Sequence, residues 1–317
     1  MRLLVLGGTR LVGRGLAAAA LAAGHEVTLF HRGVTGVDVH PEAEHLTGDR
    51  EVSLDALTGR EWDACVDVSG YLPGQVRAAA EALHGAVGWF VFVSTISVYA
   101  SLAEPTDETG LLATLPAGKS ENELTGESYG ALKVLGEQTV REWFGERATI
   151  VRPGYVVGPH DHTGRFTWWL RRAAEGGRMP IPASIHERAQ FIDAHDLGTF
   201  LLLAAEKRLP GVYNATGPVP PVGMREVLEL ASLEAGVPLE LVPVPDETVA
   251  TNGISYPLWV HGPAWRAWAD VVVARARSAG LHYRPLVDTV RETLAHGPAV
   301  EGVGPGRADE ARLLTAV

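Results

Sequence analysis

The sequence predicts an α/β fold, with a doubly wound parallel sheet and a smaller C-terminal lobe. An apolar strand at residues 3–6 runs into the glycine-rich turn "GGTRLVG" and then into a helix. Strand-like and helix-like segments alternate up to about residue 155, which is typical of βαβ units with right-handed crossovers. Beyond Gly158 the chain becomes richer in proline and tryptophan, which indicates a second lobe.

The individual elements follow from hydrophobic periodicity and from the positions of glycine and proline. Strands are expected where short apolar runs end at glycine or polar residues, namely at 3–6, 27–30, 63–68, 89–93 and 148–152, with a further short strand before Asp49. Helices are expected at 11–23, 76–83, 129–144, 166–175, 194–206, 223–235 and 286–296. The run at 89–93 is apolar throughout, as in strands that are buried on both faces.

The composition is that of a soluble globular protein. Of 317 residues, 46% are hydrophobic and 21% are charged, and the formal net charge is −11. This negative charge argues against nucleic acid and anionic membranes as partners. The first apolar run is too short for a signal peptide, and no segment reaches the ~20 apolar residues of a membrane span. We therefore expect a cytoplasmic protein.

Cysteine and histidine usage gives no sign of a metal site. Cys65 is the only cysteine, which excludes an intramolecular disulfide and a cysteine-based zinc site. It lies in an apolar run and is expected to be a small buried hydrophobe. His160 and His162 flank one aspartate in the loop "GPHDHTGR", a spacing too weak to predict a metal ion. We expect no metal.

The opening strand, glycine turn and helix predict a phosphate-binding site. Backbone N–H groups at a helix N-terminus point toward an anion, and the helix dipole favours its charge. Gly7 suits the tight turn, and Gly13 allows close packing of helix against strand. The alternative is an ordinary βα turn. The candidate dinucleotide contacts from this turn are Gly7, Gly8, Thr9, Arg10, Leu11, Val12 and Gly13.

The charges near the second strand favour NADP(H) over NAD(H). NAD-binding folds usually place an acidic residue about 20 residues after the turn, where it binds the ribose 2′-hydroxyl. Here the stretch is "LFHRG", with His31 and Arg32, and Arg10 replaces the middle glycine of the turn. A guanidinium attracts a 2′-phosphate; the alternative is that Arg32 is a solvated loop charge. Asp49 is a candidate acceptor for the adenine amino group or, equally, a turn-forming aspartate.

"ESYGALKVLGE" and "FVFVSTISVYA" suggest the chemistry. Tyr129 and Lys133 are four residues apart and share one face of a helix. The ammonium is expected to lower the pKa of the phenol from about 10 and to bind the nicotinamide ribose. Alone, the pair is also consistent with an ordinary surface helix. Ser94, Thr95 and Ser97 follow a buried strand, at the sheet edge where ligands bind.

These segments together resemble the short-chain dehydrogenase/reductase superfamily, in its extended branch with a C-terminal substrate lobe. The resemblance covers about residues 1–217, through "GGTRLVG", "STISVYA", "YGALK", "RPGYVVGP", "QFIDAHDLG" and "GVYNATGP" in order. It implies a Rossmann-type sheet with Tyr129 as the catalytic acid/base, Lys133 as its activator and Thr95 as the catalytic hydroxyl. Further candidate cofactor contacts are Arg50, Ser69, Gly70, Pro153 and Gly154.

Two departures from the family argue against a nucleotide-sugar substrate. Extended members that act on nucleotide sugars usually have an asparagine soon after the sixth strand, where this chain has Pro153-Gly154-Tyr155. They also have an arginine two positions before the aromatic residue of the "FID" segment, where this chain has Ala189. The candidate substrate contacts are Ser97, Tyr155, Trp168 and Trp169. For each tryptophan the alternative is ordinary core packing.

The expected organisation is a dinucleotide-binding domain at 1–158 joined by about 190–217, a substrate-binding lobe at 159–189 and 218–300, and a loose tail at 298–317 with a short terminal helix. The leading hypothesis is an NADPH-dependent oxidoreductase that reduces the carbonyl of a small, non-nucleotide substrate. The alternatives are an NAD(P)-dependent sugar epimerase or dehydratase, and a non-catalytic nucleotide-sensing or RNA-binding module, since such relatives share the Gly-Gly-Thr-Arg turn. A homodimer through helices such as 129–144 is compatible with the resemblance.

Overall fold

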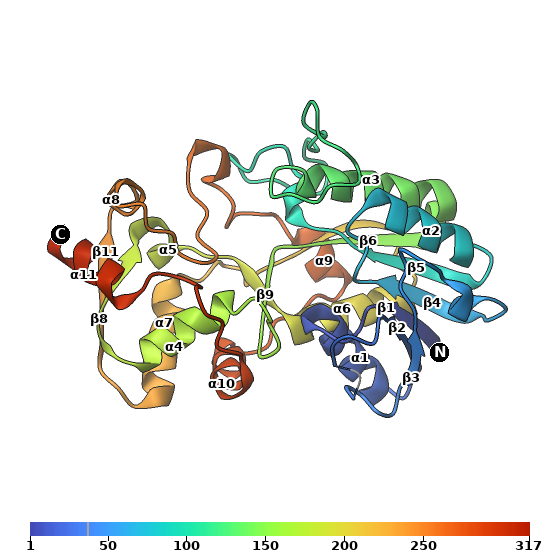
Figure 1. The fold of residues 1–317 in the computed structure, drawn as a ribbon, viewed down its shortest axis with the longest axis horizontal. Helices are drawn as coiled ribbons and strands as arrows, with labels where there is room; N and C mark the ends of the chain where they lie inside the picture. The colour runs from blue at the N-terminus through green and yellow to red at the C-terminus, as the bar shows by residue number, and fades with distance from the viewer. Residues whose placement is uncertain (37) are drawn as a thin grey trace.

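A seven-stranded parallel sheet forms the centre of the larger lobe in the computed structural model, which describes residues 1–36 and 38–317 (Figure 1). Its strand order is β10-β6-β5-β4-β1-β2-β3. The strands are β1 (Arg2–Leu6), β2 (Glu26–His31), β3 (Glu44–Thr47), β4 (Trp62–Asp67), β5 (Val87–Val93), β6 (Ala148–Pro153) and β10 (Gly211–Ala215). The chain builds the sheet outward in opposite directions on the two sides of β1, so a ligand crevice is expected at the carboxyl ends of β1 and β4. The predicted α/β, doubly wound fold class is confirmed.

Helices cover both faces of this sheet. α1 (Leu11–Ala22) and α6 (Ala194–Glu206) pack on one face, and α2 (Pro73–Leu83) and α3 (Tyr129–Phe144) pack on the other. Along β1, Leu3 and Val5 belong to the first of these cores, whereas Leu4 and Leu6 belong to the second. The strand is therefore apolar at every position because both of its faces are buried.

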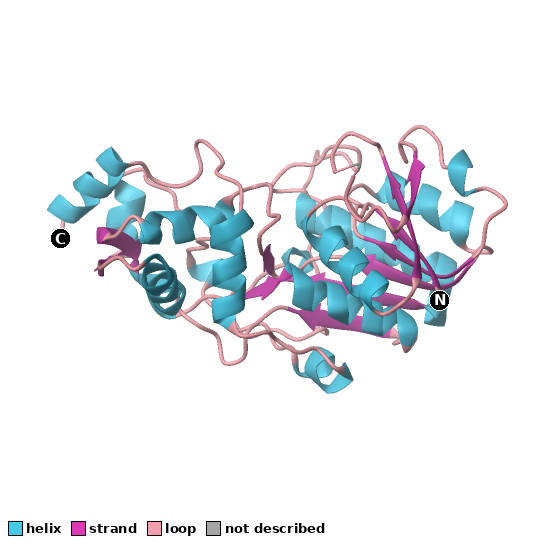
Figure 2. Ribbon diagram, turned by 90° about the horizontal axis from the view of Figure 1, so that it is seen from below, coloured by secondary structure: helices cyan, strands magenta, loops and turns pink. Residues whose placement is uncertain are grey.

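The smaller lobe is mainly helical, as Figure 2 shows. It contains a parallel pair of strands, β8 (Gly177–Pro182) and β11 (Leu239–Val244). Its helices are α4 (Arg165–Ala174), α5 (Ala183–Glu187), α7 (Met224–Ala235), α8 (Asp246–Thr251), α10 (Leu286–His296) and α11 (Arg307–Thr315). A second pair, β7 (Tyr155–Val157) and β9 (Phe191–Asp193), joins this lobe to the sheet domain (Figure 1). The short helix α9 (Ala274–Ala279) contacts the large sheet beside β10.

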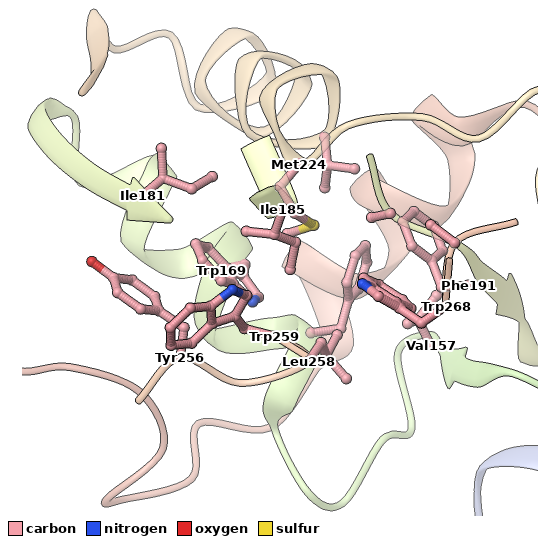
Figure 3. Close-up of a cluster of buried hydrophobic side chains, with 14 of the residues drawn as sticks. Val157, Trp169, Ile181, Ile185, Phe191, Met224, Tyr256, Leu258, Trp259 and Trp268 are labelled. Carbon is pink, nitrogen blue, oxygen red and sulfur yellow. The ribbon is translucent and has the colours of Figure 1, made fainter. Parts of the chain in front are cut away.

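An aromatic core holds the smaller lobe together (Figure 3). Trp169 is fully buried, and its ring stacks on that of Tyr256 at 5.2 Å and 16°. Trp259 lies edge-on to the same tyrosine ring. Large rings bury much apolar area per residue, so a few of them can stabilise a small lobe.

The predicted tail at 298–317 contains the short terminal helix that the sequence indicated, α11, but this helix is not loose. α11 packs on the smaller lobe, where Glu310 forms a buried ion pair with Arg172, at 2.6 Å from Oε1 to Nε. Leu313 is fully buried in the core of that lobe. The local sequence is rich in glycine and charge, and the segment is ordered by its contacts with this distant arginine and with the core of the lobe. None of the helices in the described part of the chain is long and apolar enough to cross a bilayer.

The backbones of α1 and α6 meet at two glycines. A Cβ atom added to Gly15 would lie 2.2 Å from the carbonyl oxygen of Ala194, and one added to Gly198 would lie 2.4 Å from the carbonyl carbon of Gly15. These are contacts with backbone, which cannot rotate away as a side chain can. The crossing therefore allows no side chain at either position.

Gly198→Ala is expected to lower the free energy of unfolding by about 1–3 kcal/mol, because the added methyl group forces the two helices apart. Urea unfolding followed by circular dichroism measures the change. The matched control is Gly74→Ala in α2, where an added Cβ meets nothing within 4 Å. That variant should be neutral or slightly stabilising. Equal stability of the Gly198 variant and the wild type would contradict the close crossing.

Candidate active site

The glycine turn between β1 and α1 has the backbone geometry of an anion cradle. Gly7 and Gly8 have φ angles of +112° and +101°, which other residues rarely adopt. A Cβ on Gly13 would lie 2.5 Å from the Cα of Gly8, so the first helical turn packs directly on the loop. No side chain caps the N-terminus of α1 at Arg10. The amide groups of this turn are therefore available to a phosphate, and the loop fits a dinucleotide.

The turn opens onto a cavity of about 1020 Å³ that extends along the carboxyl edge of the sheet to the smaller lobe. Most of the residues predicted from sequence line it: Gly7, Gly8, Thr9, Arg10, Leu11, Val12, Gly13, His31, Arg32, Asp49, Arg50, Ser69, Thr95, Ser97, Tyr129, Lys133, Pro153, Gly154 and Tyr155. Three do not: Gly70, Trp168 and Trp169. Residues that lie far apart in the sequence, between positions 7 and 155, thus line one cavity.

Two free guanidinium groups lie at the glycine-turn end of the cavity. Arg10 and Arg32 are both exposed, and neither forms an ion pair with any residue that the structure describes. His31 instead stabilises the loop, since its Nδ1 accepts from the amide of Gly33 at 3.0 Å and its Nε2 is 2.9 Å from Nδ1 of His45. Burial, and then the neighbouring His45, lower the pKa of His31, so it brings no charge to this end.

Asp49 and Arg50 have different roles in the wall. The Oδ1 of Asp49 accepts from the amide of Glu51 at 3.0 Å, so its side chain forms a turn at the cavity edge. Arg50 makes a bidentate ion pair with Asp67, both N–O distances being 2.8 Å, and also donates to Oγ of Ser69 at 3.1 Å. Its charge is therefore compensated within the protein, and it ties the loop after β3 to the end of β4.

Tyr129 and Thr95 lie side by side on the cavity wall. Burial raises the pKa of Tyr129 to about 12, and Tyr71 adds to the rise, whereas a hydrogen bond with Thr95 and the charge of Arg165 lower it. The Oγ1 of Thr95 also accepts from the amide of Ser97 at 3.1 Å, which orients its side chain. A phenol with this pKa keeps its proton at neutral pH.

The expected pairing of ammonium and phenol is not what this structure contains. The Nζ of Lys133 donates to the carbonyl oxygens of Val93 at 2.6 Å and Gly70 at 2.7 Å. Burial lowers the pKa of Lys133 to about 8. Lys133 is not among the groups that shift the pKa of Tyr129, which desolvation of the phenol raises, so its role as activator stays a prediction. Gly70, although outside the cavity lining, holds the lysine through its carbonyl group.

A buried polar network lies beneath these residues. Glu137, one turn beyond Lys133 on α3, forms a bidentate ion pair with Arg152 of β6 at 2.8 and 2.6 Å, and each side chain is 1% exposed. Oγ of Ser94 donates to the same carboxylate at 2.6 Å, and Arg152 also donates to the hydroxyl of Tyr99 at 3.1 Å. The hydroxyl group of Ser94 is thus bonded within the core, unlike those of Thr95 and Ser97. This network was not predicted: Glu137 and Arg152 lie in two of the quoted segments, but nothing in either segment shows that the two side chains meet.

The tryptophans predicted to contact substrate lie elsewhere. Trp169 is fully buried and its Nε1 donates to the carbonyl oxygen of Pro257 at 2.9 Å, so it belongs to the core of the smaller lobe (Figure 3). Trp168 packs on the backbone of Gly304 in the C-terminal segment. The aromatic residues that line the cavity from this lobe are instead Trp265 and Trp268.

Other lining residues were missed because no local pattern marks them. They include Tyr71, Leu72, Gln75, Leu102, Asn122, Leu124, Asp161, His162, Thr163, Arg165 and Val260. Most of them lie on loops, whose position depends on the tertiary fold. Among the residues that the structure describes, no group of three or more histidine, cysteine or acidic side chains is placed to hold a metal ion.

Comparison with known sequences shows the family. Residues 71–216 match the NAD dependent epimerase/dehydratase family. The chain is 30% identical over 92% of its length to the dTDP-6-deoxy-L-talose 4-dehydrogenase (NAD(P)(+)) of Kitasatospora kifunensis, covering 94% of that protein. It is 29% identical over 79% of its length to the 2'-dehydrokanamycin reductase of Streptomyces kanamyceticus, covering 71% of it.

Two further comparisons concern a plant protein and a solved structure. The chain is 26% identical over 68% of its length to the chloroplast stem-loop binding protein of 41 kDa b of Arabidopsis thaliana, and spans 58% of that protein. A crystal structure of a putative epimerase from Burkholderia cenocepacia J2315 superposes with a TM-score of 0.68, at 21% identity, over 93% of this chain and 97% of the other. This likeness shows a common fold.

The buried ammonium predicts that stability depends on pH. The pKa of Lys133 is about 8 in the folded protein and 10.5 ordinarily, so between these values the unfolded chain binds more protons. Stability should therefore rise with pH in this interval. Relative to Lys133→Met, the free energy of unfolding of the wild type is expected to increase by about 2–3 kcal/mol, at about 1.4 kcal/mol per pKa unit.

Urea unfolding followed by tryptophan fluorescence at a series of pH values measures this difference. The control is Lys207→Met, at an exposed lysine that follows α6, which should show no such pH dependence. A constant difference between wild type and the Lys133 variant would mean that the folded ammonium keeps its ordinary pKa.

Proposed function

The chain belongs to the NAD dependent epimerase/dehydratase family of extended short-chain dehydrogenases/reductases, and from that premise we propose that it uses NADPH to reduce the carbonyl group of a small substrate without a nucleotide. Membership of this family makes the chain an NAD(P)-dependent oxidoreductase. The proposal depends above all on one observation: Tyr129 and Thr95 line the same cavity as the glycine turn. The naming of two relatives as a reductase and a dehydrogenase supports redox chemistry.

The cofactor would lie along the glycine-turn end of the cavity. The free amides of the α1 N-terminus suit its diphosphate, and Arg10 and Arg32 suit a 2′-phosphate because both charges are uncompensated. The end of β2 carries no carboxylate of the kind that binds the ribose 2′-hydroxyl in NAD-binding folds. This favours NADPH over NADH. Two of the three N–H donors of Lys133 bond to backbone carbonyl groups, which leaves the third for a ribose hydroxyl.

Bound NADPH supplies the hydride for the carbonyl carbon, and the chain's own residues act on the carbonyl oxygen. Thr95 donates a hydrogen bond to that oxygen and orients it. Tyr129 gives it a proton, which the phenol carries at neutral pH. The positive charge of Arg165 stabilises the tyrosinate that remains.

Two features of the substrate side support a substrate without a nucleotide. A Cβ on Gly154 would lie 2.2 Å from Oγ1 of Thr216, so a side chain at this position would require Thr216 to move. Ala189 is buried and pairs with Val222 through its backbone, and the neighbouring Arg188 forms an ion pair with Asp270. Neither position offers a free polar group for a sugar-linked diphosphate.

Tyr129→Phe is expected to lower kcat by about 10²- to 10⁴-fold while leaving the Kd of NADPH nearly unchanged, because the lost hydroxyl transfers only the proton. NADPH consumption at fixed carbonyl substrate measures kcat, and calorimetric titration measures the Kd. The control is Tyr71→Phe, which removes a hydroxyl from the same cavity and should keep most of the activity. Full activity of the Tyr129 variant would exclude the mechanism, and product formation without net NADPH consumption would indicate an epimerase.

The double substitution of Arg10 and Arg32 by alanine is expected to weaken NADPH binding at least tenfold more than NADH binding, since only NADPH carries the 2′-phosphate. Calorimetric titration of both cofactors gives the ratio of the two Kd values. Arg77→Ala, at an exposed arginine of α2 outside the cavity, is the control and should leave both unchanged. Equal losses for the two cofactors would remove the basis for the NADPH preference.

A further inference from the structure

An aromatic wall closes the substrate half of the cavity. The segment 260–268 of the smaller lobe returns to the sheet domain, where the amide of Leu102 donates to the carbonyl oxygen of Ala264 and the amide of Ala267 donates to that of Leu102, both at 2.8 Å. These backbone bonds position Trp265 and Trp268 on the cavity wall. Trp268 meets the ring of Tyr155 edge-on at 5.7 Å. We define Tyr155, Trp265 and Trp268 as the aromatic wall.

A single uncompensated cation faces this wall. Arg165, the first residue of α4, lines the cavity with its guanidinium 5.6 Å from the ring of Tyr155. Its Nε donates to Oγ1 of Thr163 at 2.9 Å, and it forms no ion pair within the described part of the chain. The nearby Asp161 carboxylate accepts instead from the amide and hydroxyl of Thr163, at 3.0 and 2.6 Å.

The other cations of the cavity are already accounted for. Arg50 is paired with Asp67, and Lys133 donates to two carbonyl groups. Arg10 and Arg32 lie at the glycine-turn end, with the proposed cofactor contacts. Arg165 is thus the one guanidinium among the described lining residues that faces the substrate half without a partner. A neutral ligand in the substrate half would leave Arg165 without a partner. A diphosphate would meet too few cations in that half.

Building on the proposed function, we infer that the substrate is a cyclic or aryl ketone that carries a carboxylate. Its ring would pack against the aromatic wall, and its carboxylate would take the free N–H groups of Arg165. Aromatic side chains bury flat rings in preferred edge-on or offset geometries. A planar guanidinium matches a carboxylate with two parallel hydrogen bonds. The reaction at the ketone carbon and oxygen is the one proposed above.

The charge part is tested with three matched pairs of probes: 3-acetylbenzoate, 4-acetylbenzoate and 4-oxocyclohexanecarboxylate, each with its methyl ester. Calorimetric titration of the full chain with saturating NADP⁺ gives the Kd of each. At least one acid is expected to bind at least tenfold more tightly than its ester. Arg165→Met should bring this ratio near one with the ester unaffected, and Arg165→Lys should restore it in part. Arg171→Met, on the same helix outside the cavity, should keep it.

Three outcomes would overturn the carboxylate contact. The first is that acid and ester bind the wild type with nearly equal Kd values in every pair. The second is that the preference for the acid persists in Arg165→Met. The third is that this variant loses as much affinity for NADP⁺ as for the acid. The last result would place the guanidinium in the cofactor site. Since binding is measured without turnover, an Arg165-dependent acid preference without NADPH consumption would disprove only the proposed reductase activity.

The ring contact is tested with Trp265→Ala, because this side chain is 36% exposed and its loss should not unfold the chain. It is expected to weaken the acid and its ester by a similar factor, of about tenfold. Trp143→Ala, at a half-buried tryptophan of α3 outside the cavity, is the control and should change neither. Unchanged affinities in the Trp265 variant, with the melting temperature retained, would exclude the aromatic wall as the ring site.

Discussion

The buried ion pair between Glu137 and Arg152 is the interaction on which the arrangement of the site depends. It links the middle of α3 to β6 at 2.6–2.8 Å, with both side chains out of contact with water. Tyr129 and Lys133 lie two turns and one turn before Glu137 on the same face of this helix, so the ion pair fixes their height above the sheet. An unpaired charge at either position would be costly, which makes any other placement of α3 unfavourable.

Burial then sets the chemistry of the residues that α3 presents. The phenol of Tyr129 is desolvated and keeps its proton, whereas the desolvated ammonium of Lys133 loses its proton more readily than a lysine in water. The two groups are shifted in opposite senses by the same cause, because burial always disfavours the charged form. Burial of one face of α3 therefore accounts for both groups. The phenol keeps the proton that an alkoxide would take, and the ammonium makes hydrogen bonds.

The cavity combines two walls of different origin. The half near the glycine turn is made by the ends of successive strands, and its polar groups are backbone amides and two exposed arginines. The other half is closed by segments of the smaller lobe that the aromatic core around Trp169 and Tyr256 holds in place. Residues of that core stabilise the wall without touching the cavity. This explains why a tryptophan-rich sequence does not reveal which rings meet a ligand.

Much of the fold was predictable because its signals are local. The limits of α3, α6 and α10 follow from periodicity and end signals. The strands of the central sheet follow from short apolar runs, except for β10, which was not predicted. The short strands β7, β8, β9 and β11 were missed, since each pairs with a partner distant in sequence and carries no clear alternation. The short C-terminal helix was expected, but its packing on the smaller lobe was not, because its anchor Glu310 pairs with Arg172, 138 positions away in the sequence.

By itself, the sequence determined the glycine turn, the alternation of strands and helices that makes a parallel sheet, and the spacing of Tyr129 and Lys133, because these depend on backbone geometry and neighbours within a few residues. Only the tertiary structure decided how Lys133 is bonded, that Arg50 is neutralised by Asp67, and that Trp265, Trp268 and Arg165 face the cavity. Desolvation and ion pairing depend on which distant groups are brought together, and no local pattern records them.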